Sequence, residues 1–189
     1  MELTAIIVVV LALIVTIYGV LIYNNLVRLK HDVARSWSNI DVALKQRHDE
    51  LPKLVEVCKR YMGYEQETLE RVIRARGAVF EARSRGDVAK LGSAETALRA
   101  GLGQLFALAE NYPELKADEA FKHLSTRVSQ LEEAIADRRE LYNDGVNLNN
   151  VRIEQFPDAL VARAFGFKPF DLLEFADARA DVDLGKLFG

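Results

Sequence analysis

An uncharged apolar run from Leu3 to Ile22 constrains this chain more than any other feature. At about 1.5 Å of rise per residue, a helix over this run is about 30 Å long, which matches the hydrocarbon thickness of a bilayer. No Lys or Arg precedes the run, and the following residues Tyr23 to Leu26 lack a small-residue cleavage site. We therefore predict a retained transmembrane helix over residues 1–23, rather than a cleaved signal peptide or a buried core helix.

The charges that flank the run predict its orientation. Lys and Arg prefer the cytoplasmic side of a membrane-spanning helix. The only charged side chain before the run is Glu2, whereas Arg28, Lys30 and Arg35 follow it closely. We expect the N-terminus to lie outside and the rest of the chain to lie in the cytosol.

Composition limits what the remainder can be. The chain has 189 residues, so about one domain's length follows the anchor. A net charge of -3 gives no reason to expect a nucleic-acid partner, and a single cysteine excludes an intramolecular disulfide. Proline is scarce, and no segment alternates with the two-residue period of a strand. These features predict an all-α fold.

Apolar residues spaced by three and four predict long amphipathic helices. Proline removes a helical hydrogen bond and disfavours helical geometry in the residue before it. Pro52 should therefore either separate the first two helices, which we favour, or kink one long helix. We predict an antiparallel four-helix bundle over residues 24–170 and an acidic, loosely ordered tail over 171–189. The expected helices cover residues 24–47, continuous with the anchor, then 52–83, 88–111 and 118–155, with a short helix at 158–165.

Four segments then carry a resemblance to a known family. They are WSNIDVAL at 37–44, RHDELPKLV at 47–55, YPELK at 112–116, and FP at 156–157 together with FGF at 165–167. In these segments the chain resembles the LemA family of bacterial membrane proteins, and the resemblance covers nearly the whole sequence. It implies one N-terminal span of the inner membrane and a cytosolic helical bundle, but no activity. The family's similarity to a magnetosome-membrane protein class points toward membrane organisation.

Ionisable and nucleophilic residues form no convincing catalytic constellation. Four ionisable residues, Arg47 to Glu50, cluster beside Pro52, and His48 with Asp49 could form a metal site or a general base. No metal-binding spacing accompanies them, so we favour helix-end capping and ion pairing for this cluster. Cys58 lies on an apolar stripe and should pack in the core. A basic run over residues 71–85 is interspersed with Glu and should be a solvated helix face. We predict no catalytic residue, metal, cofactor or small-molecule substrate.

Two groups of residues are candidates for interaction instead. The first is the basic collar of Arg28, Lys30 and Arg35, which could meet anionic lipid. The second is an aromatic cluster that is either a lid on the bundle, which we favour, or an exposed docking patch; its members are Phe165, Phe167 and Phe170. Amide side chains near the end of the fourth helix, Tyr142 to Asn150, could recognise a peptide backbone or satisfy buried polar contacts to the first helix.

Three functions therefore compete. The leading interpretation is a membrane-anchored helical scaffold that binds other envelope proteins or a second copy of itself. The second is an oligomer that organises membranes or binds a lipid surface through the collar and the short helix at 158–165. The third, which we favour least, is an enzyme at the membrane surface that uses the region of His48 and Asp49.

Overall fold

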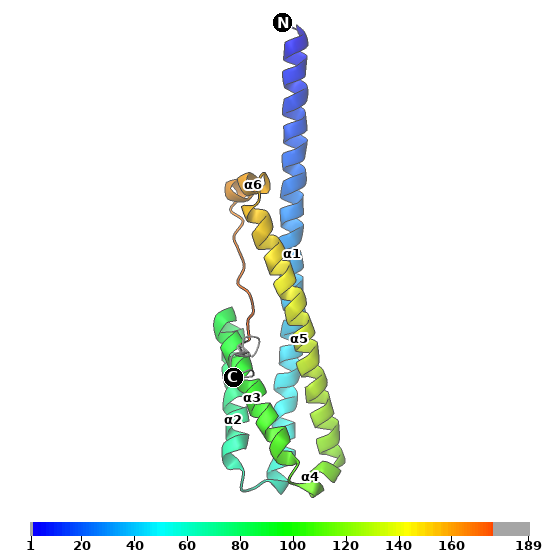
Figure 1. Ribbon diagram of the computed structural model, residues 1–189, viewed down its shortest axis with the longest axis vertical. Helices are drawn as coiled ribbons and strands as arrows, with labels where there is room; N and C mark the ends of the chain where they lie inside the picture. Colours follow the sequence, from blue (N-terminus) through cyan, green and yellow to red (C-terminus); the bar gives the residue numbers. More distant parts are fainter. Residues whose placement is uncertain (1, 176–189) are drawn as a thin grey trace, which may run out of the picture. The chain divides into compact units, whose positions relative to one another are not determined.

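The computed structural model describes residues 2–175, and all regular structure in that range is helical (Figure 1). The helices are α1 (Glu2–Tyr61), α2 (Gln66–Arg85), α3 (Val88–Ala109), α4 (Pro113–Ala117), α5 (Glu119–Glu154) and α6 (Asp158–Phe165). The prediction of an all-α fold is confirmed. The finer description, an antiparallel four-helix bundle, stays an interpretation.

The chain divides into two compact units, each built from two separate segments. The first unit comprises Met1–Asn39 and Glu140–Asp171, and the second comprises Ile40–Arg139 and Leu172–Gly189. Both boundaries near residues 39 and 139 fall inside α1 and α5, where the sequence shows no loop. The predicted bundle over 24–170 is thus shared between the two units.

Helix α1 passes through Pro52, so the predicted break at that residue is wrong. The next helix begins at Gln66, and the interruption falls at Met62–Glu65, which includes Gly63. Leu51 and Leu54, on either side of the proline, are both buried. Proline inside a helix costs about 3 kcal/mol, whereas burying one leucine contributes about 1.5–3 kcal/mol. Burial of the surrounding turns therefore outweighs the local preference.

The other helix ends follow their local signals. Gly86 has a φ of 66° and ends α2, because glycine adopts this left-handed geometry without a steric cost. Asp87 caps α3 by accepting a hydrogen bond of 3.0 Å from the Lys90 backbone N–H. Asp118 accepts bonds from the N–H groups of Ala120 and Phe121 at the start of α5. A single turn, α4, occupies the region where only a connection was predicted.

The first unit pairs α1 with the end of α5 in antiparallel fashion. Near one end Trp37 contacts Tyr142, with ring centroids 5.3 Å apart. Further along, Gly145 lies against Val33. At the other end Ile22 and Leu26 of α1 form a small core with Ala162 of α6, supported by Ile153 and Phe167.

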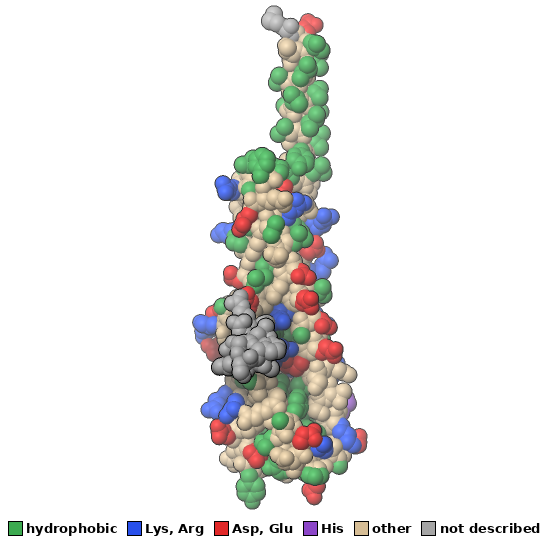
Figure 2. Space-filling view, viewed as in Figure 1, with side chains coloured by type: hydrophobic (Ala, Val, Ile, Leu, Met, Phe, Trp, Pro, Cys, Tyr) green, Lys and Arg blue, Asp and Glu red, His purple; other side chains and the backbone are tan. Residues whose placement is uncertain are grey.

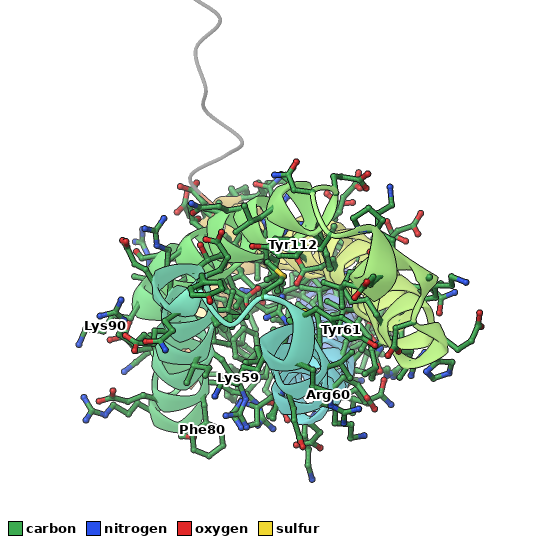
Figure 3. The ribbon with its side chains drawn as sticks, turned by 90° about the horizontal axis from the view of Figure 1, so that it is seen from below. Lys59, Arg60, Tyr61, Phe80, Lys90 and Tyr112 are labelled. Atoms are coloured by element: carbon green, nitrogen blue, oxygen red, sulfur yellow. The ribbon has the colours of Figure 1, made fainter. Side chains whose placement is uncertain are left out.

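The second unit buries side chains from α1, α2, α3 and α5. Polar contacts join the loops at the end of the unit where α1 stops and α5 begins. The Tyr61 hydroxyl donates to Asp118 over 2.9 Å, and the Tyr112 hydroxyl donates to Glu65 over 3.2 Å. Figure 3 shows Tyr61 and Tyr112 at this end. The buried apolar residues include Leu44, Leu54, Cys58, Leu69, Val72, Val79, Leu91, Leu98, Leu105, Val128, Leu131 and Ile135.

The segment after Asp171 corrects the predicted start of the tail. Leu173 and Phe175 are both buried in the second unit. The guanidinium groups of Arg99 and Arg139 lie 5.2 Å and 4.3 Å from the centre of the Phe175 ring. The packed chain therefore extends at least to Phe175, because these apolar side chains find a place against α3 and α5. The rest of the predicted tail lies outside the described residues.

Candidate functional site

A cleft in the first unit collects several of the predicted interaction residues. It has a volume of about 520 Å³ and is lined by α1, α5 and the segment after α6. Lys30, Phe165, Phe167 and Phe170 all border it. The structure thus places one residue of the basic collar beside the whole aromatic cluster, although about 135 residues separate them in the chain.

Aromatic contacts form one end of this cleft. The Tyr23 ring lies 4.7 Å from the Phe165 ring and 5.9 Å from the Phe167 ring, measured between centroids. Phe167 is partly buried against the core of Ile22 and Leu26. Phe165, in contrast, remains 65% exposed. A lid would bury its aromatic rings, so the favoured lid interpretation does not hold for Phe165.

The amide side chains near the end of α5 hold the chain that follows α6. Asn150 donates to the Phe170 carbonyl over 2.9 Å and accepts from the Phe170 N–H over 3.0 Å. The Tyr142 hydroxyl donates to the Asp171 carbonyl over 2.9 Å. These groups do recognise a peptide backbone, but it is the protein's own. Tyr142 and Asn150 make this contact with residues 170–171, whereas the sequence suggested contacts with the beginning of the first bundle helix at residues 23–25.

The other two collar residues lie outside the lining of the cleft. Arg28 is exposed and donates to Asn25 on the same helix over 2.9 Å. Arg35 is also exposed and pairs with Asp32 at 3.3 Å. Exposed pairs of this kind contribute about 0–1 kcal/mol to stability, so both guanidinium groups can exchange these partners for others.

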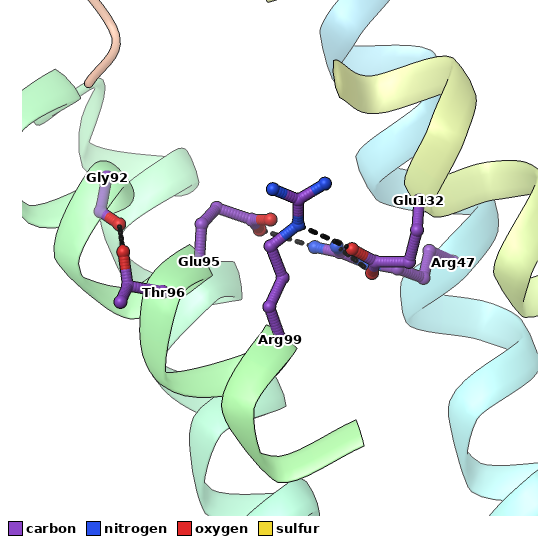
Figure 4. Close-up of polar contacts among 6 residues, drawn as sticks. All are labelled: Arg47, Gly92, Glu95, Thr96, Arg99 and Glu132. Atoms are coloured by element: carbon purple, nitrogen blue, oxygen red, sulfur yellow. Dashed lines mark hydrogen bonds and ion pairs between the residues drawn. The ribbon is translucent and has the colours of Figure 1, made fainter. Parts of the chain in front are cut away.

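A second candidate, in the second unit, is a buried cluster of charges (Figure 4). Arg47 of α1 forms ion pairs with Glu95 of α3 and Glu132 of α5. Arg99 of α3 completes the cluster with a bond of 2.9 Å from its Nε to Glu132. We call these four residues the Arg47 network. It joins three helices of the second unit through side chains of opposite charge.

Two members of the Arg47 network, Arg47 and Glu95, are held away from water. Arg47 is 1% exposed and Glu95 is 0% exposed. Burial alone would lower the pKa of Arg47, but the Glu95 and Glu132 carboxylates together raise it, so Arg47 remains a cation. The role that these contacts support is structural, because a substrate has no access to the two fully buried members.

The sequence predicted ion pairing in the cluster that contains Arg47, but at a helix end and without the partners Glu95 and Glu132. The helix-end role is wrong because α1 continues to Tyr61. A signal for the buried pair nevertheless exists in the sequence. Arg47 continues the apolar spacing of Ile40, Leu44 and Leu51 on α1. Glu95 likewise lies in step with Leu91 and Leu98 on α3. A cation on one apolar stripe and an anion on another indicate a buried ion pair, since an unpaired buried charge is very costly.

His48, on which the enzyme interpretation depends, contacts Arg76 and Phe80. Its Nε2 atom lies 2.7 Å from an Arg76 guanidinium nitrogen, and its ring stacks on Phe80 at 4.9 Å. Arginine has only donors, so Nε2 must accept this hydrogen bond and the ring is neutral. Burial and the charge of Arg76 lower the pKa of His48. The contact uses the lone pair that a general base would need.

A titration of His48 tests this assignment. We expect the pKa of its imidazole to lie below the ordinary value of about 6.5. Protonation of Nε2 would remove the lone pair that accepts the hydrogen bond from Arg76. In an Arg76→Gln variant the midpoint should move part of the way back. Histidine-selective NMR of the full chain in detergent micelles measures both values. The matched control is Arg85→Gln on the same helix, since Arg85 pairs only locally with Glu81; equal midpoints in both variants would contradict the contact.

The remaining chemical candidates are also accounted for by packing. Cys58 is buried, which raises the pKa of its thiol to about 11 and makes it a poor nucleophile at neutral pH. Arg83 of the basic run pairs with Asp41, and Arg71 pairs with Glu67 at 3.0 Å. Within residues 2–175, no group of three His, Cys, Asp or Glu side chains is arranged to hold a metal ion.

The N-terminal part of α1 is long and apolar enough to cross a membrane. Every Leu, Ile and Val from Leu3 to Leu21 is exposed. This exposure contradicts the buried core helix that the sequence left as an alternative. A mostly apolar surface of this extent is unusual for a protein in water and is typical of contact with lipid.

Comparisons with known proteins find relatives among magnetosome proteins and LemA proteins. Magnetosome protein MamQ 2 of Paramagnetospirillum magneticum and magnetosome protein MamQ of Magnetospirillum gryphiswaldense are each 27% identical to this chain over 169 residues. The aligned region covers 77% of this chain but only 62% of each of theirs. Protein LemA of Metamycoplasma hominis is 28% identical over 170 residues, which cover 87% of this chain and 74% of that protein.

The family assignment rests on a match to a family model that covers more than half of the chain. The LemA family model matches residues 36–184, which includes all of α2 to α6. All four motif segments lie within this range. The chain belongs to the LemA family.

Proposed function

We propose that this protein is a single-span membrane protein whose helical units serve as a scaffold. In this proposal residues 1–23 cross the inner membrane, the N-terminus lies outside, and the chain from residue 24 onward lies in the cytosol. The observation that carries the proposal is the exposed apolar stretch of α1, which continues without a break into the paired helices of the first unit. The charges of Arg28, Lys30 and Arg35 support the orientation.

The scaffold assignment rests on the kind of surface that the helices offer. Two clefts in the second unit lie between α1 and α2 and share Lys59 and Ile73. Figure 3 shows Lys59 at the ends of these two helices. Ile73 and Phe80 leave apolar surface exposed along α2. A groove of this type accommodates an amphipathic helix, so we assign it to other envelope proteins or to a second copy of this chain.

An enzyme is not part of this proposal. The described residues place no nucleophile beside a base, and His48 is held by Arg76. The most buried ionisable groups, Arg47 and Glu95, form an ion pair with each other. A robust turnover by the purified protein would overturn the scaffold assignment.

Cross-linking in intact membranes tests the scaffold. A photoreactive amino acid at Ile73 in the groove should give a discrete cross-linked product with a membrane protein or with the chain itself. The matched control is the same amino acid at Glu133, an exposed residue of α5 in the same unit. Mass spectrometry identifies the products. If Ile73 and Glu133 give the same diffuse pattern, the groove is not a binding surface.

A further inference from the structure

Helix α6 and its flanks expose large apolar side chains that its small core leaves uncovered. Phe156 is 78% exposed, Leu160 60% and Phe165 65%. Figure 2 shows hydrophobic side chains gathered at the α6 end of the first unit, beside those along the free stretch of α1. We call Phe156, Leu160 and Phe165 the α6 patch. Exposure of such a patch to water is unfavourable, which indicates that something other than water covers it.

The position of α6 along α1 suggests what covers the patch. The exposed apolar stretch ends at Leu21, and Ile22, the next residue, is buried against Ala162 of α6. From Leu3 to Leu21 the helix covers about 28 Å at about 1.5 Å per residue. The hydrocarbon core of a bilayer is about 30 Å thick. If this stretch crosses the membrane, α6 therefore lies at the level where hydrocarbon gives way to headgroups.

Charge at the same level is complementary to an anionic lipid surface. Lys30 and Lys168 both line the cleft beside the α6 patch. Arg163 is exposed on α6 itself, whereas the carboxylate of Asp158 is buried and paired with Arg152 at 3.0 Å. Within residues 22–30 and 152–168 the basic side chains are Arg28, Lys30, Arg152, Arg163 and Lys168, and the acidic ones are Glu154 and Asp158. The surface around the patch is thus basic.

We propose that α6 lies in the membrane interface, with Phe156, Leu160 and Phe165 inserted between lipid headgroups and with Lys30 and Lys168 facing anionic phosphate. The inference rests on the proposed membrane span and adds a second point of attachment to it. Amphipathic helices with aromatic and Leu residues on one side and cations on the other bind interfaces in this way. The anchor and α6 are joined through the core of Ile22, Leu26 and Ala162, so two contacts with lipid hold the first unit at one depth.

A lipid occupant fits the patch better than a protein does. The patch adjoins a helix surface on which every Leu, Ile and Val from Leu3 to Leu21 is exposed, and Figure 2 shows hydrophobic side chains along the visible face of that stretch. Tyr23 contacts Phe165 at that junction, and aromatic rings favour the headgroup level of a membrane. A protein partner would have to cover the patch while lipid covered its immediate neighbour.

Depth measurement on the full chain in vesicles tests the proposal. A nitroxide label attached to Leu160→Cys is compared with one on Leu141→Cys, an equally exposed leucine of α5 in the same unit. The vesicles contain equal parts of phosphatidylcholine and phosphatidylglycerol. Label 160 should collide several-fold less with a water-soluble nickel chelate than label 141, and several-fold more with oxygen. The parent chain, treated with the same nitroxide reagent, controls for any label that attaches to the buried Cys58.

Each other outcome overturns the proposal. Equal access of the nickel chelate to both labels would place α6 in water. Loss of access at 160 to both reagents would show that a protein or a second copy covers the patch. Carbonate extraction of the same vesicles separates these results from a failure of the proposed function, because a chain without a membrane span would be released.

The headgroup contact has its own control. In vesicles of phosphatidylcholine alone, label 160 should regain part of its access to the nickel chelate. A Lys30→Gln, Lys168→Gln double variant should remove the difference between the two lipid compositions, whereas Arg35→Gln, outside the cleft, should preserve it. If protection at 160 does not depend on lipid charge, the assignment of the two lysines to anionic phosphate is wrong.

Discussion

Replacing Arg47 by methionine is expected to lower the free energy of unfolding by about 3–5 kcal/mol, because it leaves a buried carboxylate without its cation. Glu95 is fully buried, and among the described residues its second oxygen, Oε2, has no hydrogen-bond partner even in the intact network. Methionine fills much of the space of the arginine stem, so the loss reports mainly on charge. Urea unfolding of the full chain in detergent, followed by helical circular dichroism, measures it.

Two further variants decide whether charge is the cause. Removing the anion as well, in an Arg47→Met, Glu95→Leu double variant, should recover part of the stability lost in the single variant, since an apolar pair replaces an ion pair without leaving a charge buried. Arg85→Met is the matched control, because Arg85 forms an exposed pair with Glu81 that contributes about 0–1 kcal/mol. If Arg47→Met unfolds like Arg85→Met, the Arg47 network does not stabilise the fold.

The buried face of each long helix was predictable, because it depends only on the spacing of apolar residues along that helix. Leu26, Leu29, Val33, Ile40 and Leu44 recur at steps of three, four and seven, and all five are buried. Local caps were predictable for the same reason. A short polar side chain before a helix binds the free N–H groups of its first turn, whatever the helix later packs against.

Pro52 shows where local rules fail. The proline signal concerns two or three neighbouring residues, whereas the burial of Leu51 and Leu54 depends on helices that are distant in sequence. The real interruption at Met62–Glu65 has a weaker local signal, a single glycine. Tertiary packing determines at which of these two positions the helix is interrupted. The packing partners cannot be derived from one segment alone.

The candidate site was predicted in its members but not in its arrangement. A cation at 30 and aromatic residues at 165–170 were each recognisable by type. Their meeting depends on Asn150, which holds the Phe170 backbone, and on the turn after α6, where Gly166 has a φ of 71°. The buried Leu173 and Phe175 were missed because an acidic composition around them resembles that of a solvated tail.

Replacing Gly92 by alanine is expected to detach the segment around Leu173 and Phe175 from the second unit. The added Cβ would lie 2.1 Å from the Glu174 carbonyl oxygen, closer than such atoms can approach, and the obstacle is backbone. Burial of these two apolar side chains contributes about 3–6 kcal/mol if both are lost from the core. The higher helix propensity of alanine returns only about 1 kcal/mol, so we expect a net loss of stability.

Gly103→Ala on the same helix provides the control that isolates this contact. A Cβ at Gly103 meets nothing within 4 Å, so this variant should gain about 1 kcal/mol from propensity alone. Urea unfolding compares the two variants, and hydrogen exchange should show faster exchange at residues 172–175 only in Gly92→Ala. A similar gain in both would mean that Glu174 does not pack on α3. A loss confined to Gly92→Ala would establish that the second unit is completed by residues that follow α6, because only their backbone stands in the way of the added atom.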